Sequence, residues 1–158
     1  MKRSIRVGFS FGLTSGIITT LGLMVGLHSS TDSKLVVIGG ILTIAIADAF
    51  AESMGVHVAA ESIQKVTKKE VWESTFSTFL FKFLFTIMFI IPVLLFSLHQ
   101  AIIISIFIGF YLIIIISIAV ARERDVKPWK MVLEHVFISV LVIILAHYAG
   151  LFIANTFI

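Results

Sequence analysis

The chain has 158 residues, of which 59% are hydrophobic and 13% charged, and its mean hydropathy is +1.12. Soluble domains carry about twice this share of charged residues, so the composition excludes an ordinary soluble domain and predicts an all-α integral membrane protein. The net charge is +3, but the basic residues cluster in short segments between apolar runs, which indicates membrane topology and not nucleic-acid binding. The chain has no cysteine, which excludes disulfides and thiolate metal sites.

Five apolar segments are long enough to cross the hydrocarbon core of a bilayer, which takes roughly 20 helical residues. The segments between them are too short to fold alone, so we expect a single five-helix transmembrane domain over residues 1–158. The apolar run after the charged start has no clear cleavage site, so we expect the first span to be retained. The predicted spans are residues 7–28, 35–62, 75–98, 101–120 and 131–157.

The first predicted span carries small residues along one helical face about 120° wide. Small residues let two helix backbones approach closely in lipid. The face could pack against another helix of the same chain, or it could form the seam of a symmetric dimer with a polar path along it. The residues of this face are Gly8, Gly12, Ser15, Gly16, Thr19, Gly22 and Gly26.

The second predicted span contains IADAFAESMGVHVAAES, in which Asp48 and Glu52 lie one turn apart near the bilayer midplane. A carboxylate costs roughly 2.5 kcal/mol or more at this depth, so such acids tend to be functional. Two carboxylates at this spacing are half a site for a divalent cation, and acids in hydrocarbon can also carry protons. A second stripe with Met54, His57 and Glu61 would receive metal from the cytoplasm and adds softer donors, which suit Fe(II), Mn(II), Co(II) or Zn(II).

A structural role for these acids is the alternative, because Lys82 of the third span or hydroxyls of the first could neutralise them. For Lys82 itself the simpler expectation is that its stem lies in lipid and its amine snorkels to the headgroups. The other expectation is that it pairs with an intramembrane acid.

Ten of the twelve basic residues lie before the first span, after the second or after the fourth, and Lys34 alone lies in the other loops. By the positive-inside rule, we expect the N-terminus in the cytoplasm and the C-terminus outside, in a prokaryotic cytoplasmic membrane. Glu70 and Glu73 could recruit cations at the membrane surface, and His147 with Tyr148 could form a satisfied core pair. For each of these residues, a solvated or interfacial position is the simpler expectation. An intramembrane aspartyl protease needs two facing aspartates, and only Asp48 is deep in a span, so we expect no enzyme.

Three segments are similar to vacuolar iron transporters. GLTSGIITTLGLMVG resembles the G-x-x-D-G-I-x-T-T-x-G-L-x-x-G run of that family's first helix, IADAFAESMGVHVAAES resembles its second helix, and HYAGLFI resembles its closing Tyr-x-x-Gly segment. The resemblance implies a five-helix protomer that forms a homodimer through its first helix. It also implies divalent metal leaving the cytoplasm in exchange for protons, along a path at the dimer seam, with metal as substrate and no permanently bound cofactor.

This sequence departs from the family pattern in two places. Ser15 stands where the family has an aspartate in the first helix, so Asp48 or Glu52 would replace that ligand. The family's glutamate-rich cytoplasmic helices shrink to about a dozen residues, which leaves Glu61, Glu70 and Glu73 to capture metal. The sequence thus predicts an iron or manganese exporter, which the resemblance implies is a proton antiporter. The alternative is a non-transporting membrane assembly or partner-binding protein with structural acids.

Overall fold

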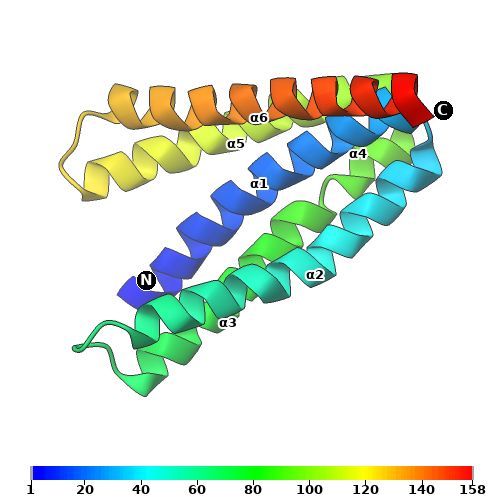
Figure 1. Ribbon diagram of the computed structural model, residues 1–158. Helices are drawn as coiled ribbons and strands as arrows, with labels where there is room; N and C mark the ends of the chain where they lie inside the picture. The colour runs from blue at the N-terminus through cyan, green and yellow to red at the C-terminus, as the bar shows by residue number, and fades with distance from the viewer. Residues whose placement is uncertain (1, 158) are drawn as a thin grey trace.

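The computed structural model describes residues 2–157, which form six helices joined by short turns (Figure 1). Five membrane spans are long and apolar enough to cross a bilayer, with the third made of two consecutive helices. The sequence-based expectation of an all-α, multi-pass membrane protein is therefore confirmed for this part of the chain. The helices are α1(Arg3–Thr31), α2(Lys34–Glu61), α3(Lys68–Ile87), α4(Ile90–Leu95), α5(Leu98–Glu123) and α6(Pro128–Phe157).

Local hydrogen bonds fix where α2 and α3 begin. The Ser33 side chain caps the start of α2 by accepting a bond from the backbone of Val36. At α3, Thr67 and Glu70 form a reciprocal capping box, which satisfies two backbone N–H groups that a helix start leaves unpaired. The capping box places the start of α3 at Lys68, seven residues before the predicted span, and several other helix ends extend three or four residues beyond the apolar runs.

The third span, predicted over residues 75–98, is present in the structure, but its helix is interrupted. The helix breaks at Met88 and Phe89 and resumes as α4. Pro92 explains the break, because it has no N–H to donate to the carbonyl of Met88 and its ring would clash with that carbonyl. The Met88 carbonyl instead accepts a bond from the backbone N–H of Ile91, at 3.2 Å.

Helix α1 lies at the centre of the bundle, between the α2–α3 pair and the α5–α6 pair (Figure 1). The N-terminus and the turns at residues 62–67 and 124–127 lie at one end, which we call the basic end, and the C-terminus lies at the other. Ten basic residues therefore gather at or near one end of the bundle. This arrangement fits the predicted topology, and which end faces the cytoplasm stays a prediction.

The glycines of the small-residue face in α1 pack against helices of the same chain. A Cβ on Gly12 would lie 2.8 Å from the Thr78 carbonyl oxygen of α3, and one on Gly8 would also meet α3 backbone. Further along, Gly22 and Gly26 pack against Val142 and Ala146 of α6. Of the two uses that the sequence left open for these glycines, close packing inside the protomer is the one that the structure shows.

Candidate cation site in the membrane core

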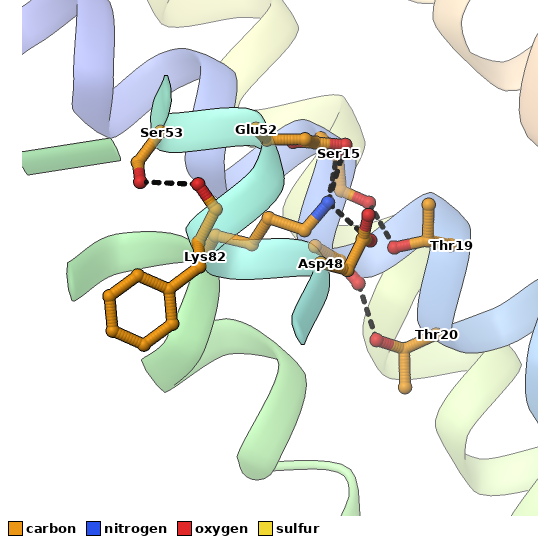
Figure 2. A network of polar contacts seen from close by, with 9 residues as sticks. Ser15, Thr19, Thr20, Asp48, Glu52, Ser53 and Lys82 are labelled. Carbon is orange, nitrogen blue, oxygen red and sulfur yellow. Dashed lines mark hydrogen bonds and ion pairs between the residues drawn. The ribbon is translucent and has the colours of Figure 1, made fainter. Parts of the chain in front are cut away.

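Lys82 of α3 joins both intramembrane acids of α2 in one cluster (Figure 2). Its Nζ lies 2.6 Å from Oδ2 of Asp48 and 2.5 Å from Oε1 of Glu52. Nζ also donates a 2.9 Å hydrogen bond to Oγ of Ser15 on α1. An ammonium group has three N–H donors, so this geometry gives each of them an oxygen partner. We call Ser15, Asp48, Glu52 and Lys82 the acid–lysine cluster.

The Lys82 side chain is 0% exposed, so the expectation that it snorkels to the headgroups is wrong. It is held inside by close packing of α1 on α3. A Cβ on Gly12 would come within 2.9 Å of the Lys82 backbone nitrogen, and one on Gly16 within 3.2 Å of its carbonyl oxygen. The absence of side chains at these two positions lets the α3 backbone approach α1 at Lys82, and this brings the ammonium group within reach of α2.

Ser15 links the acids to the central helix. Its hydroxyl donates to the Glu52 carboxylate, with oxygen–oxygen distances of 2.6 and 2.7 Å, and accepts from Lys82. Thr19, one turn further, is half-buried and bonds back to the Ser15 carbonyl. The α1 position at which the resemblance expects an aspartate thus touches the acid that was predicted to replace it.

The cluster lies deep in the bundle but is open on one side. Asp48 is in the middle of α2, the fifteenth of its 28 residues. The side chains of Asp48 and Glu52 keep 32% and 24% of their surface exposed in the protomer, whereas Lys82 keeps none. The carboxylates therefore line the edge between α1 and α2, and the ammonium lies behind them.

The second predicted stripe does not join this cluster. His57 turns toward α3, where its Nδ1 lies 2.9 Å from Oγ1 of Thr75, and its Nε2 is 3.5 Å from Oε1 of Glu61. Met54 is 50% exposed on the outer surface of the bundle. The structure therefore separates these softer donors from Asp48 and Glu52, as the helical wheel had predicted.

The two acids predicted to capture metal near the membrane surface have other partners. Glu70 accepts bonds from the backbone and hydroxyl of Thr67 in the capping box of α3. Glu73 lies 2.6 Å from Lys2 Nζ and accepts a 2.6 Å bond from Ser4. Both acids thus stabilise the basic end, one by capping α3 and the other by tying the start of α1 to α3.

No group of three histidine, aspartate or glutamate side chains that could hold a metal ion occurs within residues 2–157. His147 accepts or donates a 2.7 Å bond at Nδ1 with Ser29 of α1, while Tyr148 is 64% exposed. Both residues are exposed in the protomer, as expected for an interfacial position, and they do not form the core pair that was the other possibility. His28 and His99 lie near each other at the same end, with ring centroids 6.0 Å apart.

The candidate site is therefore the acid–lysine cluster, which has two carboxylates, one hydroxyl and one buried cation. The sequence predicted the carboxylates and Ser15, and it raised Lys82 only as the less favoured partner. The sequence did contain a signal for this pairing. Lys82 lies near the middle of the third span, which runs antiparallel to α2, so its depth in the membrane is close to that of Asp48. No protein-family model matches the chain, and no curated protein sequence matches it either.

Proposed function

We propose that this protein is a dimeric transporter that moves a divalent metal cation, manganese or iron, out of the cytoplasm in exchange for protons. The observation that carries the proposal is the acid–lysine cluster itself. Two carboxylates in the middle of an apolar helix already hold a positive group, and they remain partly open on the opposite side. Charged groups at such depth are costly to keep, and they tend to mark ion and proton pathways.

Charge balance indicates how the exchange would proceed. With all groups ionised, Asp48, Glu52 and Lys82 together carry one excess negative charge. A divalent cation that replaces the ammonium at the carboxylates leaves the cluster neutral if Lys82 loses one proton. Each bound ion would therefore displace a proton, and reprotonation of Lys82 would restore the ion pairs and expel the metal.

The donor atoms favour manganese among the candidate metals. Asp48, Glu52 and Ser15 offer oxygen only, and carboxylate and water ligands suit Mg(II), Ca(II) and Mn(II). The softer donors that supported iron, Met54 and His57, lie outside the cluster. Iron stays a candidate substrate because Fe(II) also accepts carboxylate ligands.

A second copy of the chain would cover the open side of the cluster. On α2, small side chains recur every fourth residue along an exposed stripe beside the acids, and a Cβ on Gly39 or Gly55 would meet nothing within 4 Å. Small residues at this spacing favour close helix association in lipid. We therefore move the proposed dimer seam from the α1 glycines to this stripe, which consists of Gly39, Thr43, Ala47, Ala51, Gly55 and Ala59.

The test is proton flux driven by a manganese gradient. In proteoliposomes that contain a pH-sensitive dye, the internal pH should change only when a Mn(II) gradient is imposed across the membrane and the wild-type protein is present. The matched control is the triple variant Asp48→Asn, Glu52→Gln, Lys82→Met, which removes all three charges together and leaves no uncompensated one. Absence of flux in the wild type, or equal flux in the triple variant, would overturn the proposal.

A structural role for the cluster is the second candidate, and one observation favours it: each N–H of the Lys82 ammonium already has a partner. In that case the protein is a membrane assembly or partner-binding protein whose acids hold α1, α2 and α3 together. The same liposomes distinguish the two, because a purely structural cluster predicts no manganese-driven flux in the wild type.

A further inference from the structure

A cavity of about 700 Å³ opens between α1 and the α5–α6 pair at the basic end of the bundle. It is lined by one face of α1, by the last turns of α5 and by the first turns of α6. The acid–lysine cluster does not line it, because that cluster lies where α1 meets α2 and α3. The cavity is therefore a separate feature, and the proposed transport does not use it.

The cavity arises from the way α1 packs against the other two helices. Near the C-terminal end the helices touch closely: a Cβ on Gly150 of α6 would meet the Gly26 carbonyl and the Ser29 side chain, and Gly109 of α5 packs against Leu21. Toward the basic end, α1 diverges from α5 and α6 (Figure 1). A wedge is left that opens toward the basic end.

The mouth of the wedge is positively charged. Arg3, Arg6 and Arg124 line it together with a single acid, Glu123, which pairs with Arg6 at 2.8 Å. No ion pair or side-chain hydrogen bond joins Arg3 or Arg124 to another residue in the part of the chain that the structure describes. Two guanidinium groups are thus available at the mouth, and they would repel a divalent cation and attract an anion.

The walls behind the mouth are mainly apolar. Val7 and Phe11 of α1 face Val120 of α5 and Met131 of α6 across the wedge. From Arg3 to Thr14, the deepest α1 residue that lines it, the helix rises by about 16 Å. This length is close to half of a hydrocarbon core of about 30 Å, which is the depth of one lipid leaflet.

We propose that the wedge binds an anionic phospholipid, with its phosphate between Arg3 and Arg124 and one acyl chain along Val7 and Phe11. Guanidinium groups match phosphate oxygens in a bidentate geometry, and a basic pocket between transmembrane helices suits an anionic headgroup. The combination of a basic mouth with an apolar wall of leaflet depth fits an amphiphile better than a free phosphate. This proposal is independent of the proposed transport.

Lipid binding to the purified, full-length protein tests it. Native mass spectrometry gives the apparent affinity for phosphatidylglycerol and for phosphatidylcholine with the same acyl chains. We expect the wild type to bind phosphatidylglycerol at least tenfold more tightly. The double variant Arg3→Gln, Arg124→Gln should bind it about thirtyfold more weakly than the wild type.

The matched control is Lys65→Gln, Lys68→Gln, which removes two charges at the same end but outside the wedge and should bind like the wild type. Met131→Trp would fill the wedge while keeping its charged mouth, and it should also weaken phosphatidylglycerol binding. Lipid binding is measured only for variants that elute as a single folded species in size-exclusion chromatography. Equal affinity for the two lipids, unchanged binding in the arginine variant, or displacement of the lipid by equimolar inorganic phosphate would overturn the proposal.

Discussion

The positive charge of one side chain, Lys82, partly offsets the two carboxylates in the membrane core of this protein. Lys82 is buried without any exposed surface and holds Asp48 and Glu52 of α2 and Ser15 of α1. Removing one partner of such a cluster leaves the others without compensation, whereas removing all charges together does not. The net contribution of the ion pairs to stability is therefore small, and the penalty for breaking them is large.

Lys82→Met should accordingly destabilise the protein by about 3 kcal/mol, because it leaves two carboxylates in a site of low polarity. The measurement is unfolding of the detergent-solubilised protein, followed by circular dichroism. Adding Asp48→Asn and Glu52→Gln to the same variant should recover most of the loss. A lysine that snorkels to the headgroups would instead give a stable single variant, and that result would contradict the buried cluster.

The acids of this cluster could be recognised from the sequence because a carboxylate in an apolar run is conspicuous. The partner of these acids could not be assigned from the sequence. Whether the Lys82 amine reaches the lipid headgroups or pairs with an acid depends on how closely α1 and α3 pack. That distance is set by Gly12 and Gly16, whose role becomes visible only when the α3 backbone is placed against them. A helical wheel gives the face of a residue but not the helix that covers it.

At the scale of the helices, glycine positions set which pairs pack closely. Gly8, Gly12 and Gly16 face α3, while Gly22 and Gly26 face α6, so one helix serves two neighbours along its length. Hydropathy predicted all five spans, but it missed the break before α4. Pro92 was the available signal, since its missing N–H frees the carbonyl of Met88 four residues earlier.

Gly12→Ala should lower the stability of the protein by about 1 to 3 kcal/mol, because its Cβ would lie 2.8 Å from the Thr78 carbonyl oxygen and force α1 away from α3. Leu145→Ala is the control, as Leu145 is exposed on α6, away from the contact of α1 with α3 and from the proposed dimer stripe. The control should keep or raise the melting temperature, because alanine favours the helix. Equal behaviour of the two variants in a thermal melt would refute this packing account.

For the whole molecule, the distribution of charge between the two ends predicts the orientation in the membrane. The chain has no cysteine, so a single introduced cysteine reports its own accessibility. We expect a membrane-impermeant maleimide to label Thr31→Cys in intact cells and to label Gln64→Cys only after permeabilisation, because Gln64 lies at the basic end. The reverse pattern would invert the topology and, with it, the proposed direction of transport.

The proposed dimer can be tested in the same cysteine-free background. Ala51→Cys, on the exposed small-residue stripe of α2, should form a disulfide-linked dimer in membranes under mild oxidation. Leu141→Cys is the control, since Leu141 is also an exposed apolar residue but lies on α6. Cross-linking through Leu141→Cys and not through Ala51→Cys would place any dimer contact elsewhere and leave the acids uncovered.

The central claim is that a divalent metal competes with Lys82 for Asp48 and Glu52. The most direct measurement is anomalous diffraction from crystals grown with Mn(II), recorded beside metal-free crystals. The account predicts an anomalous peak within about 2.2 Å of oxygens from both carboxylates, with the Lys82 ammonium displaced from them. An intact acid–lysine cluster with no manganese beside it, at metal concentrations that saturate transport, would contradict the account.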